Sequence, residues 1–597
     1  LGRMAVSAYK VPQKELAFIF DEIINYSEIC SMPGFEEASR DMVDVVLPEA
    51  AKFFEDIVAP TNHETDKNPA FLKDGEVITS PGLDPIYRQM VEAGWCCLNG
   101  DSNYGGAGFP SVVDLAVQEM LQTANCGFSL LPMLTRGVVH ALNQYGSDEQ
   151  KDTYLGNLIS GAWSGTMNLT EPQAGSDLSA VKTKAILNGD HYLISGQKIY
   201  ITWGDHSCAD NIIHLVLARR PDAPEGNQGI SLFLVPKFLV NGDGSLGQRN
   251  DVKPVGVEHK LGIHSSPTCT LAFGDNGGAV GYLVGEENKG LQCMFTMMNN
   301  ARLSVGHQGV ALGERAYQQA VAYATDRVQG RASGVEGRAP IIHHSDVKRM
   351  LMQMRALTEG GRAMSYHAIA AEDRSSHHPD EQVRANSAQM VELLTPLVKG
   401  WCTEVAMEST SLGVQVHGGM GFIEETGAAQ HMRDARILPI YEGTNGIQAL
   451  DFIGRKCLRD GGQTVQVLLA DMQSTVDQLA SAHGSVANLR NRLRHGIEQC
   501  QSALQYVLEN SSESQGIAYN FMMMYGNTVA YWLLVKLAAA AQDRLTAGET
   551  DRFYNQKIAT AEFFSTQILP RNSGYLATLT LGAESFDALQ PADFLSA

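Results

Sequence analysis

Residues Ile440 to Gln448 place one carboxylate where it could act as a base. Glu442 is followed directly by Gly443 in the run Ile-Tyr-Glu-Gly-Thr-Asn-Gly-Ile-Gln. A carboxylate can remove a proton from carbon, and a glycine lets the backbone come close enough for an N–H group to bind the reacting oxygen. Such a proton removal becomes an oxidation only when something accepts a hydride. No side chain can do so, and this chemistry therefore needs a cofactor such as a flavin.

Composition limits the other classes of function. The chain has 597 residues, 44% of them hydrophobic and 19% charged, which predicts a globular protein of several domains. Its formal net charge of −21 disfavours binding to nucleic acid or to anionic membrane surfaces, because both are bound mainly through Lys and Arg clusters.

The cysteines and the apolar runs point to a cytoplasmic protein without a metal site. The ten cysteines form no CxxC pair and no zinc-type spacing with histidine, which fits a reducing compartment. The longest nearly uncharged run, Val529 to Ala541, contains Lys536 and is shorter than a bilayer requires, and it predicts a buried helix. The N-terminus shows no targeting pattern.

The chain changes character twice along its length. Helical periodicity dominates the N-terminal part, and short β-branched and aromatic runs then predict strands at His191–Ile194, Ile199–Thr202, Ile212–Ala218 and Ile230–Val235. Helical periodicity returns at Arg302–Arg327, His344–Asp373 and Glu381–Leu412, and further helices are predicted at Val465–Ala480, Ala487–Glu509, Ala518–Thr546 and Asp551–Leu569.

These changes predict an α+β multidomain fold. We expect an N-terminal helical extension (1–40), an N-terminal helical domain (41–162), a central β-domain (163–285), a helical bundle that contains Glu442 (286–455) and an additional C-terminal helical domain (456–597). The glycine cluster Gly418–Gly421 does not follow a predicted strand, so a Rossmann-type nicotinamide site is not expected.

Six segments resemble, in the right order, the signatures of the acyl-CoA dehydrogenase family: Glu171–Asp177, Gly196–Thr202, Lys260–Gly262, Arg327–Gly330, Gln415–Gly421 and Ile440–Gln448. The resemblance implies the acyl-CoA dehydrogenase fold, FAD as cofactor and an acyl-CoA thioester as substrate. The N-terminal extension and the C-terminal helical domain resemble those of the larger bacterial members, especially the 3-methylmercaptopropionyl-CoA dehydrogenase group.

The resemblance also assigns residues to the flavin. The cofactor-binding set in the β-domain is Met167, Leu169, Thr170, Gly175, Ser176, Tyr200, Ile201 and Thr202. Thr202 would lie beside flavin N5, and Ser176 would also touch CoA. Strand alternation places Tyr200 and Thr202 on one face and Ile201 on the other. Family members usually have Trp where Tyr200 stands.

Further cofactor contacts are implied in the helical bundle. Arg327 resembles an arginine that reaches the FAD of a neighbouring subunit, although Gln329 stands where the family usually has Phe. Gln415, Gly418 and Gly419 would complete this shared site, and Thr444 and Asn445 are assigned to the cofactor as well. A homodimer or a dimer of dimers is therefore expected.

Within the family, the base occupies one of two positions. One is Glu442, and the other falls here on Ala301, which cannot accept a proton. The nearby Glu424 and Glu425 match neither position. Gly443 and Arg302 are assigned to substrate binding. Desolvation beside the substrate would raise the pKa of Glu442, and a nearby Arg302 would oppose that shift.

The substrate, the electron acceptor and the class of protein each keep an alternative. The favoured function is α,β-dehydrogenation of 3-methylmercaptopropionyl-CoA with electrons passed to electron-transferring flavoprotein. Short- to medium-chain fatty acyl-CoAs are an alternative substrate class, and acyl-CoA oxidase, which passes electrons to oxygen, is an alternative reaction. A non-catalytic flavin-binding stress protein of the same fold is a different class, but the acidic net charge disfavours the nucleic-acid binding expected there.

Overall fold

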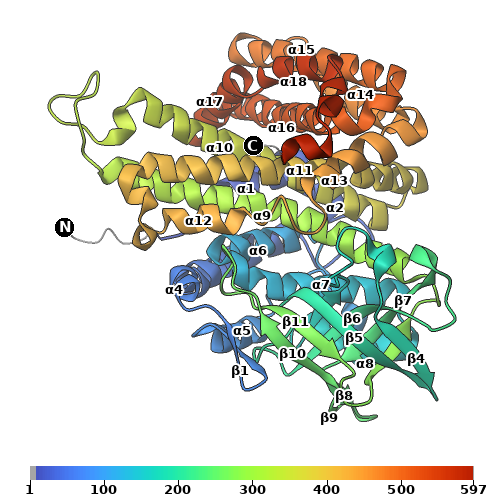
Figure 1. Ribbon diagram of the computed structural model, residues 1–597. Coiled ribbons are helices and arrows are strands. Elements are labelled where there is room, and N and C mark those ends of the chain that lie inside the picture. The colour runs from blue at the N-terminus through green and yellow to red at the C-terminus, as the bar shows by residue number, and fades with distance from the viewer. Residues whose placement is uncertain (1–7, 596–597) are drawn as a thin grey trace. The chain divides into compact units, whose positions relative to one another are not determined.

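A computed structural model describes residues 8–595 (Figure 1), so the predicted domain ends at 1–7 and 596–597 lie outside the described residues. The chain packs into two compact units, and each is described by itself. Residues 8–11 and 41–304 form what we call the β-containing unit. Residues 12–40 and 305–595 form the helical unit.

The β-containing unit begins with helices and a small hairpin: α3 (Arg40–Phe53), a π-helical turn (Phe54–Val58), α4 (Thr61–Lys67), β1 (Phe71–Lys73), β2 (Glu76–Ile78), α5 (Leu83–Glu92), α6 (Ser111–Ala124), α7 (Cys126–Tyr145) and α8 (Asp148–Ser160). Local capping fixes several of these ends. Ser147 and Gln150 form a reciprocal capping box at the start of α8, and Gly161 ends the helix at a φ of 88°.

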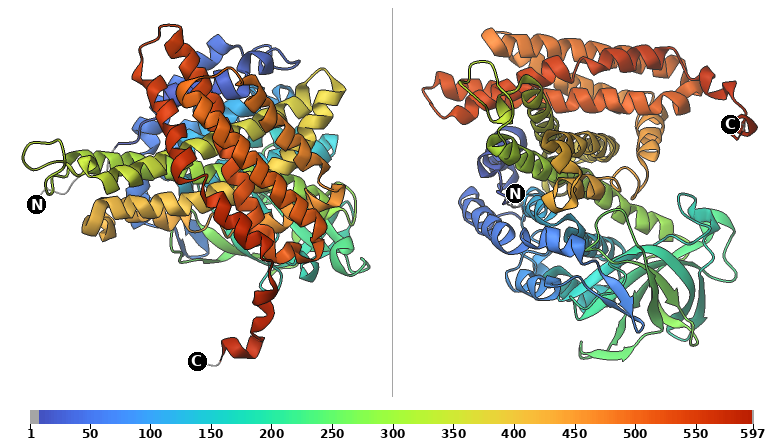
Figure 2. Two further views of the ribbon diagram at one scale, coloured as in Figure 1. Left: turned by 90° about the horizontal axis from the view of Figure 1, so that it is seen from above. Right: turned by 60° about the vertical axis from the view of Figure 1, so that its left-hand side comes forward.

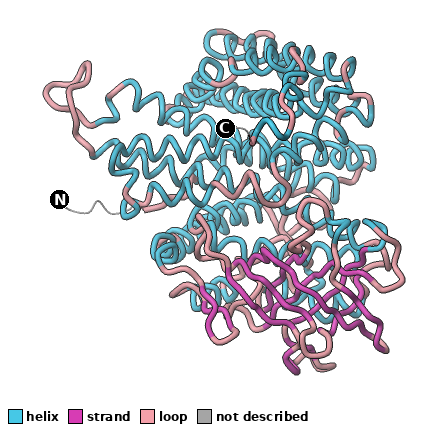
Figure 3. The backbone as a smooth tube through the Cα atoms, viewed as in Figure 1, coloured by secondary structure: helices cyan, strands magenta, loops and turns pink. Residues whose placement is uncertain are grey.

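The strands of this unit are β3 (Trp163–Asn168), β4 (Lys184–Asn188), β5 (His191–Thr202), β6 (Asn211–Arg219), β7 (Ile230–Pro236), β8 (Phe238–Val240), β9 (Leu246–Arg249), β10 (Val252–Val257), β11 (Thr268–Phe273) and β12 (Ala279–Val284). The main sheet has the order β10-β11-β5-β12-β7-β6-β3, and β4 pairs with β5 and β6. Figure 3 shows these strands gathered together in magenta. The predicted strands within β6 and β7 are confirmed.

Strand β5 joins two strands that the sequence predicts separately. Its first half pairs with β4 and β12, and its second half pairs with β11, so the backbone stays extended through the intervening glycine, Gly196. The pairing of β5 with β11 contains a bulge, because Ile199 and Tyr200 together face Thr270 alone. This bulge lies in the segment predicted to face the flavin.

The helical unit contains α1 (Gln13–Ile19), a π-helix (Phe20–Ile24), α2 (Tyr26–Ile29), most of α9 (Gly290–Asp326), α10 (Ser345–His377), α11 (Glu381–His417), α12 (Ala428–Ala435), α13 (Asn445–Leu450), a π-helix (Asp451–Arg455), α14 (Gln463–Gln478), α15 (Gly484–Glu509), α16 (Ser514–Thr546), α17 (Arg552–Gln567) and α18 (Arg571–Thr580). The predicted long helices are all present. Both views in Figure 2 show α14–α18, coloured orange to red, lying side by side, with the segment after α18 extending away from them.

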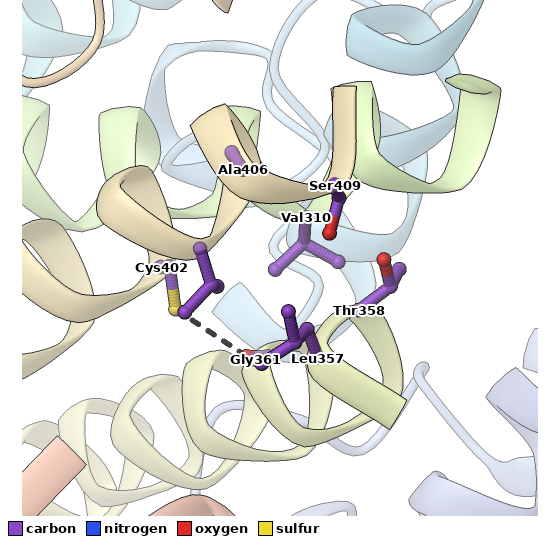
Figure 4. Close-up of a pocket in the computed structure, with 9 residues that line it drawn as sticks. Val310, Leu357, Thr358, Gly361, Cys402, Ala406 and Ser409 are labelled. Atoms are coloured by element: carbon purple, nitrogen blue, oxygen red, sulfur yellow. Dashed lines mark hydrogen bonds between the residues drawn. The ribbon is translucent and has the colours of Figure 1, made fainter. Parts of the chain in front are cut away.

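Small residues let α9, α10 and α11 approach closely. Figure 4 shows the narrow pocket between them, with the Cys402 thiol donating to the carbonyl oxygen of Gly361 at 3.8 Å. A Cβ atom at Gly361 would lie 3.3 Å from the Cys402 sulfur, so this crossing favours glycine. Burial raises the pKa of the Cys402 thiol to about 12, which makes Cys402 a packing residue.

Buried polar contacts join the last helices to the rest of the helical unit. Lys557 of α17 pairs with Glu15 of α1 and, at 2.6 Å, with Glu359 of α10. The indole of Trp401 on α11 donates to Asn527 of α16 at 2.8 Å. The N-terminal extension and the C-terminal helices therefore share a core with the bundle.

Membrane-spanning helices and clustered metal ligands are both absent from residues 8–595. None of the helices there is both long and apolar enough to cross a membrane. That part of the chain also contains no group of three or more His, Cys, Asp or Glu side chains suited to a metal ion.

Candidate active site

The end of β5 presents the residues predicted to face the flavin. The Tyr200 side chain is 61% exposed, whereas Ile201 is 2% exposed and Thr202 is half-buried. These exposures agree with the predicted placement of Tyr200 and Thr202 opposite Ile201, and the bulge accounts for the burial of Lys198 two residues before Tyr200. Tyr200 lies in the bulge with a φ of 58°, in the left-handed region that non-glycine residues rarely occupy. Such backbone strain is common at ligand sites, where surrounding contacts maintain it.

The loop after β3 holds the other part of this set. Met167 is buried at the end of the strand, Thr170 is half-buried, and Gly175 and Ser176 are exposed. The backbones of Glu171 and Ala174 exchange two hydrogen bonds of 2.9 Å, which closes a tight turn. The turn leaves Gly175 and Ser176 accessible.

A buried ion pair between Lys198 of β5 and Glu171 fixes this loop to the strand. Lys198, which is fully buried in β5, donates to the Glu171 carboxylate at 2.9 Å and to the carbonyl oxygen of Leu169 at 2.9 Å. The amides of Lys182 and Thr183 and the Thr183 hydroxyl also donate to Glu171. The Gln173 side chain donates as well, at 2.5 Å, so the Glu171 carboxylate collects five donor groups.

These contacts set the charges of the pair. Burial raises the pKa of Glu171, but the Lys198 ammonium and the donors from Thr183 and Lys182 outweigh it and hold the pKa at about 2. Burial lowers the pKa of Lys198 to about 8, and Glu171 opposes that shift. Both groups are therefore charged at neutral pH.

The loop and the strand meet edge to edge. The backbone N–H of Ile199 donates to the carbonyl oxygen of Thr170 at 2.9 Å, one residue before Tyr200. The β-containing unit therefore brings the predicted loop residues beside the predicted strand residues. An exposed aromatic ring, nearby hydroxyl groups and the open glycine Gly175, where an added Cβ atom would meet nothing within 4 Å, fit a flavin nucleotide.

The third segment in the β-containing unit, Lys260–Gly262, is followed by a charged histidine. One ring nitrogen of His264 lies 3.0 Å from Asp66, and the other lies 2.7 Å from the carbonyl oxygen of Lys260. Both nitrogens face acceptors, so the imidazolium form is favoured. The hydrogen bond with Asp66 raises the pKa of His264 to about 9, although burial opposes the shift.

In the helical unit, Glu442 lies on a strained loop between α12 and α13. Glu442 has a φ of 57° and Gly443 a φ of 87°, so two consecutive residues are left-handed. The amide of Asn445 donates to the carbonyl oxygen of Pro439 at 3.0 Å and closes the loop. The Gln448 side chain donates to the carbonyl oxygen of Gly443 at 3.1 Å.

Other contacts fix the two ends of this loop. The Tyr441 hydroxyl donates to Gln308 of α9 at 2.6 Å. Thr444 caps α13, because its hydroxyl accepts from the Ile447 amide at 3.3 Å. The Asn445 side chain is buried and contacts Lys399 of α11. The predicted contacts of Thr444 and Asn445 with FAD stay predictions.

The remaining predicted residues lie in helices or directly after them, and only Arg302 among them is buried. Arg327 follows the end of α9, and Gln415, Gly418 and Gly419 lie at the end of α11; all four are exposed in the helical unit. Gly418 has a φ of 59°, which a side chain would strain. Arg302 is buried on α9 next to Ala301, within the β-containing unit.

Three residues that fix these loops, Lys198, Lys399 and Gln448, are not among the predicted site residues. Lys198 lies in phase with the buried residues Tyr192 and Ile194 of β5, and a lysine on the buried side of a strand signals a partner. Lys399 lies within the buried, mostly apolar stretch Leu393–Thr403 of α11 and gives a similar signal. Gln448 belongs to the matching segment, but nothing in the sequence indicates its contact with Gly443.

The comparisons with known proteins cover nearly the whole chain. Four family models match in order: "Acyl-CoA dehydrogenase, N-terminal domain" at residues 44–162, "Acyl-CoA dehydrogenase, middle domain" at 166–276, "Acyl-CoA dehydrogenase, C-terminal domain" at 288–458 and "Acetyl-CoA dehydrogenase C-terminal like" at 468–590. The first three correspond to the fold expected from the sequence, and the fourth covers the additional helices.

Full-length relatives agree with these matches. The chain is 46% identical to 3-methylmercaptopropionyl-CoA dehydrogenase of Ruegeria pomeroyi over 96% of this chain and 98% of the relative. It is 34% identical to the broad-specificity linear acyl-CoA dehydrogenase FadE5 of Mycobacterium tuberculosis over 95% and 96%.

A solved structure has the same fold. The acyl-CoA dehydrogenase of Bacillus anthracis, determined in complex with FAD, superimposes with a TM-score of 0.72 at 24% identity, covering 99% of this chain and 94% of that chain. The chain therefore belongs to the acyl-CoA dehydrogenase family, as an FAD-dependent oxidoreductase that acts on the CH–CH group of acyl-CoA thioesters.

Proposed function

We propose that Glu442 is the base that removes the α-proton of the acyl-CoA thioester. The observation that carries this proposal is the left-handed backbone at Glu442 and Gly443, pinned by Asn445 and Gln448. Strain of this kind costs free energy and persists where surrounding contacts enforce it, which is typical of catalytic loops.

The residues of this chain divide the reaction between them. The Glu442 carboxylate takes the α-proton, while the backbone N–H of Glu442 binds the thioester oxygen as negative charge develops on it. Gly443 leaves room for that oxygen. When bound, FAD supplies the acceptor for the hydride that leaves the β-carbon. The proton and the hydride leave a carbon–carbon double bond in the thioester.

Residues of the β-containing unit and residues of the helical unit are each proposed to contact FAD. Met167, Leu169, Thr170, Gly175, Ser176, Tyr200, Ile201 and Thr202 are the proposed contacts of the β-containing unit. Arg327, Gln415, Gly418, Gly419, Thr444 and Asn445 are the proposed contacts of the helical unit. Arg327 offers a permanently charged fork that suits a pyrophosphate. Ser176, Arg302 and Gly443 are proposed to contact the substrate.

The variant Glu442→Gln tests the base directly. It keeps the shape and size of the side chain, so the protein should fold and bind FAD normally. We expect the rate constant of flavin bleaching by substrate under anaerobic conditions to fall on the order of 10³-fold, because the amide cannot accept the proton. Bleaching at the wild-type rate would exclude Glu442 as the base.

We propose 3-methylmercaptopropionyl-CoA as the preferred substrate. The 46% identity to the Ruegeria pomeroyi dehydrogenase over nearly the full length of both chains supports this choice. The lower, 34% identity to a broad-specificity relative keeps linear short- to medium-chain acyl-CoAs as the second candidate. Anaerobic bleaching with a panel of thioesters separates the two. Much faster reaction with octanoyl-CoA than with the sulfur-containing thioester would overturn the narrower assignment.

We propose electron-transferring flavoprotein as the electron acceptor. Both full-length relatives are named dehydrogenases, which supports this acceptor over oxygen. Substrate-dependent reduction of added flavoprotein, without hydrogen peroxide, is the expected result. Stoichiometric peroxide in its place would make the enzyme an oxidase.

We propose that the chain works in the cytoplasm as a homodimer or a dimer of dimers. Large apolar side chains near Gln415 and Gly418 are exposed, above all Phe422 at 86% and also Met420 and Ile423 at 45% each. Apolar groups gathered in this way are typical of interfaces. Sedimentation of the wild type and of Phe422→Ser tests the proposal, and a monomeric wild type would contradict it.

A further inference from the structure

The Asn445 carboxamide is bound to one turn of α11 through both of its polar atoms. Its oxygen accepts from the Lys399 ammonium at 3.0 Å. Its nitrogen donates to the Glu404 carboxylate at 2.9 Å and to the carbonyl oxygen of Gly400 at 3.2 Å, and the Thr403 hydroxyl lies 2.8 Å from the same nitrogen. Asn445 is 4% exposed and Lys399 is fully buried, so these hydrogen bonds form away from water.

This anchor lies within three residues of Glu442. The same residue, Asn445, closes the loop through its backbone hydrogen bond to Pro439. On the other side, Gln448 holds the carbonyl oxygen of Gly443. The peptide between Glu442 and Gly443 thus lies between two fixed points, and loss of either would let the left-handed residues relax toward negative φ.

Helix α16 of the additional helical domain packs against the same turn of α11. Met522 of α16 occupies the space beside Gly400 so closely that a Cβ atom there would collide with its sulfur. Asn527 of α16 accepts from the indole of Trp401. Burial and the nearby Glu404 carboxylate raise the pKa of the Tyr519 phenol on α16.

We propose that Lys399 and Asn445 are positioning residues that hold Glu442 in its reactive conformation, with α16 of the additional helical domain as their support. The inference rests on the proposed role of Glu442 as the base. It gives the additional domain a part in the reaction, because the turn of α11 that binds Asn445 is packed against α16.

The single variants Asn445→Ala and Lys399→Met test the inference. For flavin-loaded protein we expect the limiting rate constant of anaerobic bleaching to fall about 10- to 100-fold, because small misplacements of a base have effects of this size. The substrate concentration for half-maximal rate should change less than about 3-fold, since the proposed substrate contacts Ser176, Arg302 and Gly443 are untouched. The pH profile of the rate should shift, and hydrogen exchange at residues 439–448 should accelerate.

Thr475→Val is the matched control. It removes a buried hydrogen bond of 2.7 Å to the Trp532 indole within the additional helices, without contact to the loop. We expect lower stability but a normal limiting rate, pH profile and loop exchange. Equal behaviour of this control and the Asn445 variant would overturn the inference.

A double variant that exchanges the amide of Asn445 and the carboxylate of Glu404 tests whether the lost rate is recovered. Asn445→Asp alone places a second carboxylate against Glu404, whereas Asn445→Asp with Glu404→Gln restores one donor and one acceptor in reversed order. The double variant should react at least about 5-fold faster than Asn445→Asp. If Asn445→Ala does not fold, this pair decides, and no gain from the second substitution overturns the inference. Wild-type bleaching by Glu442→Gln would instead overturn the base itself, so the two failures are distinguishable.

Discussion

Two loops carry the proposed chemistry, and a buried lysine fixes each of them through a different kind of partner. In the β-containing unit, Lys198 pairs with the carboxylate of Glu171 beneath the proposed flavin loop. In the helical unit, Lys399 binds the neutral amide of Asn445 beneath the proposed catalytic loop. Both lysines are fully buried.

This difference predicts how each loop responds when its lysine is removed. Loss of Lys198 leaves a buried carboxylate, whose desolvation is costly. Loss of Lys399 leaves a carboxamide that keeps other hydrogen-bond partners. We therefore expect the flavin loop to respond through stability and the catalytic loop to respond through rate. A left-handed residue accompanies each loop, Tyr200 in the neighbouring strand β5 and Glu442 in the catalytic loop itself, so strain alone does not separate them.

The variant Lys198→Met should give the largest effect. Breaking a buried ion pair by removing one partner costs about 3–5 kcal/mol of the free energy of unfolding, compared with about 1–3 kcal/mol for the hydrogen bond to Asn445 that Lys399→Met removes. Urea unfolding of both variants, with FAD content measured in parallel, checks the ranking. Equal losses in the two variants would break the comparison. Adding Glu171→Gln to Lys198→Met should recover part of the stability.

The variant Glu442→Gly should give a smaller effect of opposite sign. Glycine accepts a φ of 57° without a steric penalty, which we expect to outweigh its entropy in the unfolded chain and to stabilise the fold by about 1 kcal/mol. Activity should be lost with the carboxylate. Thermal unfolding of the FAD-bound protein measures the gain. A destabilised Glu442→Gly protein would mean that contacts of the carboxylate, rather than backbone strain, dominate this loop.

The variant His264→Asn should give the smallest effect and concerns the ionic character of the β-containing unit. The folded pKa of about 9 lies above the ordinary value of 6.5, so the contribution of His264 is complete below pH 6.5 and is lost as pH rises through 9. After screening by solvent it amounts to about 0.5 kcal/mol. Melting temperatures between pH 6 and pH 9.5 should fall more steeply for wild type than for the variant. Parallel curves of melting temperature against pH for the two proteins would show that the charge of His264 does not stabilise the fold.

The layout of the fold follows from patterns that are visible along the chain. The β-branched runs predict β6 and β7, and the helical periodicity predicts α10, α11 and α14–α17. The prediction separates β5 into two strands because Gly196 interrupts the apolar pattern, whereas pairing with β11 on one side and β12 on the other keeps the strand extended. The small hairpin β1–β2 escapes prediction, because each strand has three residues.

The site is predictable in its residue types but not in its contacts. Glu442 and Thr202 follow from matching segments, whereas the exposure of Tyr200 depends on the bulge in β5, which the alternation does not predict. The left-handed backbone at Glu442 has no signal in a glutamate. The contact of Lys399 with Asn445 joins residues on different helices, so it depends on how α11 and α13 pack.

The glycine at position 400 couples the bundle to the added helices by shape. It leaves a gap in α11 that the sulfur of Met522 fills, so the bundle surface and the added helices have complementary shapes. A chain that lost the last helices would expose this gap beside Trp401, directly behind the loop that holds Glu442. A side chain at position 400 would therefore require the Met522 side chain to move or to be replaced by a smaller one, so substitutions at the two positions are coupled.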